Sequence, residues 1–157
     1  MNDRALREQL AALLRWEDAH ASLDRVVQGV PHERWSAGAS GLPYTLWQLL
    51  EHVRLTQHDI LDFCRNPGYA ELRWPDDYWP ASGAAPTPED ITATLSGLRQ
   101  DREALTAMAL DTRTDLFARI PHGTGQTYLR ELLLVADHTS YHLGQMVVVR
   151  RALGIWD

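Results

Sequence analysis

The sequence predicts an all-α protein built as a bundle of four helices. Three observations support this fold class. Four long segments repeat apolar residues at helical spacing, three of them begin with a recognisable helix cap, and no convincing strand–helix–strand unit occurs. At 157 residues the chain has the length of one ordinary domain with its own hydrophobic core. We therefore expect residues 1–157 to form a single domain.

The first two helices are predicted over the N-terminal part of the chain. The first runs from residue 3 to residue 28 and ends at the Gly-Val-Pro sequence that follows. Its apolar stripe consists of Leu6, Leu10, Leu13, Leu23 and Val27. The second begins after Thr45, which forms a capping-box pattern with Gln48, and stops at the Asn-Pro-Gly sequence at 66–68.

The last two helices have equally clear beginnings. Thr87 followed by Pro88 reads as an N-cap with proline at the first helical position, and it predicts a helix over 88–110. Thr127 caps a helix over 128–153, and Gly154 ends it. Four such helices joined by loops are typical of a helix bundle.

Long irregular loops follow the second and third predicted helices, at 69–87 and 111–126. The first of these loops contains several prolines together with Trp74, Tyr78 and Trp79. A disordered linker would be poor in aromatic residues. We therefore expect this loop to pack back on the bundle, over one end.

Composition excludes several classes of protein. A single Cys rules out a disulfide framework and a cysteine-rich zinc site, so a metal site would have to use the seven His or carboxylates. The chain has no Lys, which excludes Schiff-base chemistry and a P-loop lysine. A net charge of −6 argues against nucleic-acid binding. No apolar run is long enough for a membrane span and the N-terminus lacks a secretory signal, so we expect a cytoplasmic protein without a membrane partner.

The strongest chemical signal is the pair His138 and His142 within the last predicted helix. This spacing places two imidazoles about 40° apart and about 6 Å along the helix axis, where both can reach one metal ion. Two histidines at this spacing also occur on exposed helix faces without a metal. Here the pair lies between Val135 and Val149 on one stripe, so it faces an interior where an unpaired nitrogen is costly. Thr139 stands where zinc proteases carry their catalytic Glu.

A third ligand has to come from another helix, and His52 lies on the inward side of the second one. His58 lies about 240° further around that helix and is expected to be solvated or packed at an edge. His20 continues the apolar stripe of the first helix, so it is either a hydrogen-bonded core residue or a residue lining the same cavity. His32 and His122 fall in loops and are expected at the surface.

Four stretches resemble the DinB-like (DinB/YfiT) superfamily: Trp-Gln-Leu-Leu-Glu-His at 47–52, the segment 136–145, the Arg-Arg-Ala-Leu-Gly end at 150–154 and the aromatic loop within 65–80. The resemblance implies an up-down four-helix bundle that holds a divalent metal ion, usually nickel or zinc, through three histidines. Iron and manganese also suit such ligands.

Carried over by motif, the implied metal ligands are His52, His138 and His142, in agreement with the helix-face argument. Gln145 matches a glutamine that follows the paired histidines in the family. His20 occupies a place where some members carry a histidine, near the open side of the metal. Both residues are thus candidates for lining the cavity of the site.

The resemblance also implies a range of activities. Some relatives transfer or isomerise groups with a low-molecular-weight thiol, which points to an S-transferase that acts on small electrophiles. A metal-dependent hydrolase and a non-catalytic, stress-related metal-binding protein are the alternatives. Cys64 lies about three turns beyond His52 and is expected to be buried and inert, so any reacting thiol would have to be a cofactor. The aromatic loops make a homodimer the expected assembly.

Overall fold

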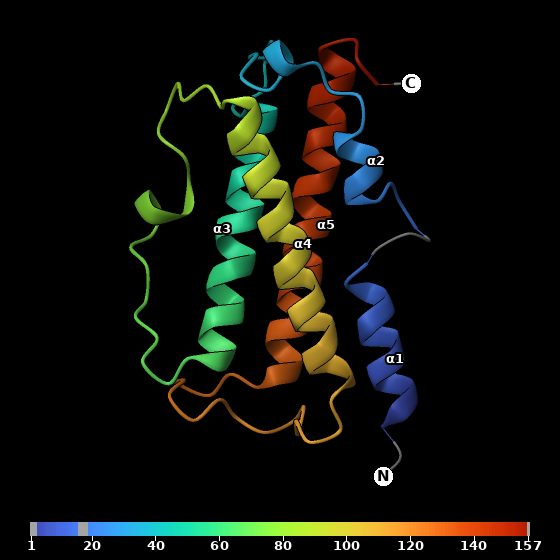
Figure 1. Ribbon diagram of the computed structural model, residues 1–157, viewed down its shortest axis with the longest axis vertical. Coiled ribbons are helices and arrows are strands. Elements are labelled where there is room, and N and C mark those ends of the chain that lie inside the picture. The colour runs from blue at the N-terminus through green and yellow to red at the C-terminus, as the bar shows by residue number, and fades with distance from the viewer. Residues whose placement is uncertain (1–2, 16–18, 157) are drawn as a thin grey trace.

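The computed structural model describes residues 3–15 and 19–156, which form helices joined by loops (Figure 1). Within these residues the strand-like pairing is one isolated bridge between Arg119 and Thr127. In the same residues no helix is both long enough and apolar enough to cross a membrane. The helices are α1 (Arg4–Leu13), α2 (Leu23–Val27), η1 (His32–Arg34), α3 (Leu46–Arg65), η2 (Asp76–Tyr78), α4 (Pro88–Leu110) and α5 (Tyr128–Ala152).

The continuous first helix predicted over 3–28 is wrong. Helix α1 ends at Leu13, and the separate short helix α2 begins after Ser22. The Ser22 hydroxyl accepts a hydrogen bond from the backbone N–H of Arg25 at 3.3 Å, so this serine starts a new helix instead of continuing an old one. Residues 16–18 of the predicted helix lie outside the described residues.

The other three helices agree with their predicted bounds to within one residue at the C-terminal end. The capping box that begins α3 is confirmed: the Thr45 hydroxyl accepts from the N–H of Gln48 at 3.2 Å, and the Gln48 side chain accepts from the N–H of Thr45 at 3.0 Å. Thr87 and Thr127 cap α4 and α5 in the predicted positions. Local cap chemistry therefore determines where the long helices start.

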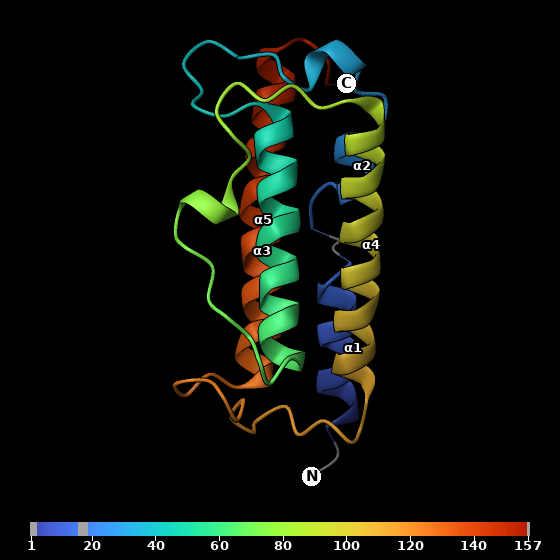
Figure 2. The same ribbon diagram turned by 60° about the vertical axis from the view of Figure 1, so that its left-hand side comes forward.

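The helices do not alternate strictly up and down. Figures 1 and 2 show α1 and α5 running in one direction and α3 and α4 in the other. The loop at 66–87, here called the strap, packs back on the bundle as predicted, but most of it lies along the side of α3, and only its last part crosses one end to the start of α4. About twenty loop residues can easily span the ~30 Å length of a twenty-residue helix, so the chain can start α4 at the same end as α3.

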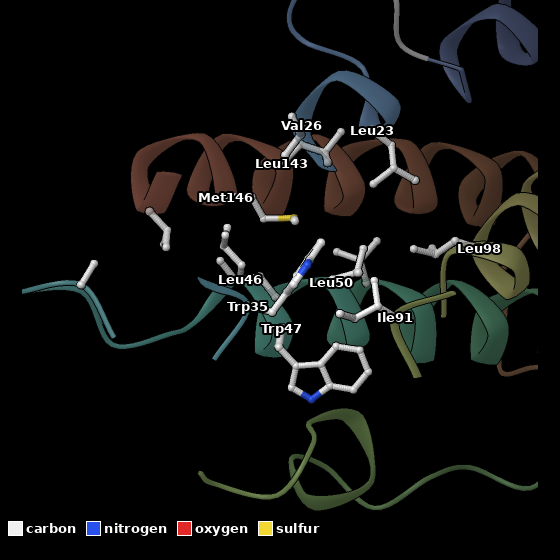
Figure 3. Packing of buried hydrophobic residues seen from close by; sticks show 14 residues of the cluster. Leu23, Val26, Trp35, Leu46, Trp47, Leu50, Ile91, Leu98, Leu143 and Met146 are labelled. Atoms are coloured by element: carbon white, nitrogen blue, oxygen red, sulfur yellow. The ribbon is translucent and has the colours of Figure 1, made fainter. Parts of the chain in front are cut away.

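The core consists of two clusters of buried apolar residues. The first joins α2, the first halves of α3 and α4 and the second half of α5, and includes Leu46, Leu98 and Met146 (Figure 3). The second joins α1, the ends of α3 and α4 and the start of α5. Residues 138–142 of α5 lie between the parts of that helix that belong to the two clusters.

Two buried arginines fasten the short N-terminal helices to the long ones. Arg150 donates to the carbonyl oxygens of Val26 at 2.7 Å and Gln28 at 3.0 Å, at the end of α2. Arg7 donates to carbonyls at the end of α4, including that of Ala109 at 3.1 Å. Both guanidinium groups satisfy carbonyl oxygens that a helix end leaves without an intrahelical partner.

Candidate metal centre

Three histidines from two helices lie together beneath the strap. The Nε2 atoms of His52 on α3 and His138 on α5 are 3.1 Å apart. One imidazole nitrogen from each of His52, His138 and His142 lies within 4.8 Å of the others. The three rings are inclined to one another by 63° to 84°, so they meet edge to face and do not stack. The structure thus brings together the three residues that the spacing and the resemblance selected.

Helix geometry accounts for this convergence. His138 and His142 are one turn apart on α5, and α3 is the helix that packs most extensively against α5. His52 lies in the second turn of α3, close to its capped start. Because both helices are held by core residues on either side of the histidines, the three imidazoles are presented from rigid backbone.

Two of the three imidazoles are oriented by a hydrogen bond on the nitrogen that faces away from the cluster. Nδ1 of His52 donates to the carbonyl oxygen of Tyr78 at 2.7 Å, and Nδ1 of His142 donates to Oε1 of Gln145 at 2.7 Å. A carbonyl oxygen can only accept, so Nδ1 carries the proton and Nε2 carries the lone pair. This is the arrangement by which metal-binding histidines are usually held in the correct tautomer. Gln145 therefore contacts a proposed ligand directly.

Aromatic side chains form a wall around the cluster. Trp79 of the strap stacks on the His52 ring with centroids 3.8 Å apart and planes 5° apart. Tyr44 stacks on the other side of Trp79 at 4.6 Å. Tyr141 meets the His142 ring edge to face at 4.9 Å. None of these three residues was among the predicted site residues, although the aromatic content of the strap was a signal that could have indicated Trp79.

A carboxylate two helical turns beyond His52 holds the strap in place. Asp59 accepts hydrogen bonds from the hydroxyl of Tyr69 at 2.9 Å and from the hydroxyl of Tyr78 at 2.8 Å. Burial, together with the negative charge of Asp59, raises the pKa of Tyr78 to about 12, so its hydroxyl stays protonated and donates. Since the carbonyl of Tyr78 accepts from His52, the strap anchor and the histidine orientation depend on the same residue.

The three imidazoles are neutral at neutral pH. Burial lowers the pKa values of His52 and His142, and burial together with the two neighbouring histidines lowers the pKa of His138 to about 3. Only 2% of His52 and 6% of His142 is exposed. Neutral imidazole is the form that binds a metal ion, so protons do not compete for these nitrogens near pH 7.

The donor set fits a divalent transition metal. Three neutral nitrogens at such separations suit zinc, nickel, iron or manganese, whereas calcium and magnesium prefer oxygen ligands. One turn after His52 on the same helix, the hydroxyl of Thr56 is buried without a hydrogen-bond partner among the described residues.

His20 is not part of the three-histidine centre and does not lie in the helix predicted for it. Its Nε2 is 3.0 Å from the Ser140 hydroxyl. Ser140 lies about 200° around α5 from His138, because each residue advances about 100°. His20 is exposed and contacts the opposite side of α5 from the proposed ligands.

The remaining histidines and the cysteine also lie outside the centre. His32, His58 and His122 are exposed, as predicted. Cys64 is buried, as predicted, and burial raises the pKa of its thiol to about 12. A thiol with so high a pKa is an inert core residue near pH 7.

Comparison with known proteins supplies the family. A profile of the DinB superfamily matches residues 15–146, a stretch that contains all three histidines of the centre and Gln145. No curated protein and no solved structure gives a significant match. The matched stretch covers most of the sequence and agrees with the helical fold. The chain is a member of the DinB superfamily.

Proposed function

We propose that the chain binds a divalent metal ion through the Nε2 atoms of His52, His138 and His142. The observation that carries this proposal is the pair of hydrogen bonds from Nδ1 of His52 and His142, which leave the Nε2 lone pair of each ring free to bind an ion. Nickel or zinc is the expected ion, with iron and manganese as alternatives, because affinity order alone does not select the metal in a cell.

We further propose that this centre serves a thiol-dependent S-transferase, in which a low-molecular-weight thiol attacks a small electrophile. Three protein ligands leave at least one coordination position for another molecule, as in catalytic metal sites. When bound there, the ion would supply the positive charge that favours the thiolate form of a thiol. The protein's own contribution is to keep three ligands neutral, to orient His52 and His142, and to cover the His52 ring with Trp79.

Two features of the chain favour an external thiol over other chemistries. Cys64 is buried with a raised pKa, so the protein has no reactive thiol of its own. Thr139 follows His138 where a zinc protease would carry its general base, which disfavours a hydrolase of that type.

A second candidate, a non-catalytic metal-binding protein, is favoured by one specific observation. His52 and His142 are almost fully buried, and Trp79 lies flat against the His52 ring. A centre enclosed in this way on every side would hold a metal ion without admitting a substrate. The two candidates therefore differ in whether the metal can be reached by a small molecule.

Cobalt substitution separates these candidates. The protein with Cys64→Ala is loaded with Co²⁺ and titrated with low-molecular-weight thiols, so that any sulfur–cobalt absorption band must come from the added thiol. The transferase proposal predicts such a band, its loss in His138→Ala, and turnover with at least one electrophile. Cobalt binding without a thiol band and without turnover would favour the non-catalytic alternative.

A further inference from the structure

An apolar cavity of 440 Å³ lies against the outer side of the metal centre, between the loop that precedes α3 and the exposed face of α5. We call it the α5 cavity; Tyr44, Leu49, Tyr141, Gln145 and Val148 line it. Its volume falls within the range of pockets that bind small molecules. Its lining combines fully or almost fully buried residues, Leu49 and Val149, with Tyr141, which is 64% exposed.

The chemistry of the lining indicates what the α5 cavity can hold. No charged side chain lines it, although 23% of the chain is charged and four other cavities in the described part of the chain each include charged residues. An ion placed there would lose its hydration without gaining a partner. The lining therefore selects an uncharged and largely apolar molecule.

The lining includes one amide side chain, Gln145, beside the two tyrosines. Oε1 of Gln145 accepts the hydrogen bond from His142, so the two N–H groups of the same amide are the donors that Gln145 can offer a ligand. A ligand with a carbonyl or ether oxygen would match these donors. Through Gln145 the α5 cavity also adjoins a proposed metal ligand.

We propose that the α5 cavity is a binding site for a small uncharged molecule that is mostly apolar and carries one hydrogen-bond acceptor. A second copy of the chain is the other conceivable occupant, because Tyr141 and Val148 are exposed on the same helix. The volume of the cavity and its lining without charged side chains are those of a small-molecule site, and they favour that occupant over a second copy.

The test uses prodan, an uncharged naphthyl ketone whose fluorescence reports an apolar environment. It is titrated into the metal-free protein, so binding is measured independently of the proposed metal chemistry. We expect saturable binding of one molecule per chain. An analogue with a propyl group in place of the propionyl group keeps the carbon skeleton without the carbonyl oxygen; measured by displacement of prodan, it should bind about 2- to 10-fold more weakly, which is the range expected for one hydrogen bond.

Matched variants locate the binding. Val148→Trp fills the cavity rim and should weaken prodan binding at least tenfold, and Val148→Asp should do so by adding a charge. Leu133→Trp is the control, because Leu133 lies on the same helix and is 45% exposed against 49% for Val148, but lies outside the cavity. Helical circular dichroism and melting temperature confirm that each variant is folded.

Three results would overturn the proposal. One is the absence of saturable prodan binding to wild type, and another is equal weakening by Leu133→Trp and Val148→Trp. The third is a sedimentation result in which wild type self-associates, Val148→Asp stays monomeric, and added prodan does not change the self-association of wild type. This would make the face an interface between copies. Because no metal is present, none of these results bears on the three-histidine centre.

Discussion

Replacing Gln145 by Leu tests the orientation of His142 most sharply. The substitution removes the oxygen that accepts from Nδ1 of His142 at 2.7 Å and keeps the side-chain volume similar. Loss of a partner of this kind typically lowers metal affinity 10- to 100-fold, or about 1.4–2.8 kcal/mol. Gln145→Glu keeps an acceptor and adds a negative charge, so it should bind metal at least as tightly as wild type.

The same substitution at another glutamine provides the control. Gln57 is buried on α3, and its amide donates to the carbonyl oxygen of Leu98 at 2.8 Å, away from the histidines. Gln57→Leu should lower the free energy of unfolding by about 1–3 kcal/mol and leave metal affinity unchanged. Gln145 is partly exposed, so Gln145→Leu should show the opposite pattern.

Both affinities are measured by competition with a chromophoric chelator for Zn²⁺ and Ni²⁺, and stability is measured by urea unfolding of the metal-free proteins. The reasoning is refuted if Gln145→Leu binds metal within twofold of wild type. It is also refuted if Gln57→Leu loses as much affinity as Gln145→Leu, because the effect would then come from general loosening of the fold.

Three further predictions follow from the strap, the histidine pKa values and the cysteine. Tyr78→Phe should lower metal affinity several-fold, whereas Tyr69→Phe should not, because both variants lose a hydrogen bond to Asp59 but only Tyr78 also contacts a proposed ligand, His52. Chelator competition compares the two variants, and equal losses of affinity would contradict the role of the strap. The metal-free protein should lose stability as pH falls from about 6.5 toward about 3, because the unfolded state then binds a proton that folded His138 does not; His138 alone contributes a slope of up to about 1.4 kcal/mol per pH unit, and His52 and His142 add to it in the same direction. Urea unfolding across this range checks it, and a flat profile would be inconsistent with a neutral His138. Cys64 should react with a disulfide reagent only after unfolding, and Cys64→Ala should retain full metal content. Rapid reaction of the folded protein would contradict this prediction, because it would show that the thiol is accessible.

The sequence was a good guide where local chemistry determines structure. Thr45 and Gln48 satisfy each other's backbone N–H groups, so the start of α3 could be predicted to the residue. His138 and His142 share a helix face by spacing alone, and His52 follows from the inward face of the neighbouring helix. Burial of Cys64 followed from its place on the second helix.

Features that depend on the path of the chain could not be predicted in the same way. The carbonyl of Tyr78 that orients His52 belongs to the backbone, which carries no sequence signature. The stacking of Trp79 on His52 requires the strap to run along α3, and the prediction placed it over one end. Apolar periodicity carried the first predicted helix through Ser22, because Leu23 and Val27 continue the stripe of α1 although they belong to α2.

Metal content of the untagged protein tests the central claim most directly. Wild type, His142→Ala and His58→Ala are purified without a histidine tag, loaded with Zn²⁺ or Ni²⁺, desalted and analysed by mass spectrometry of the metal. His58 is exposed on the same helix as His52 and serves as the control. We predict close to one equivalent of metal in wild type and His58→Ala and almost none in His142→Ala. Equal, sub-stoichiometric metal in wild type and His142→Ala would contradict a three-histidine centre.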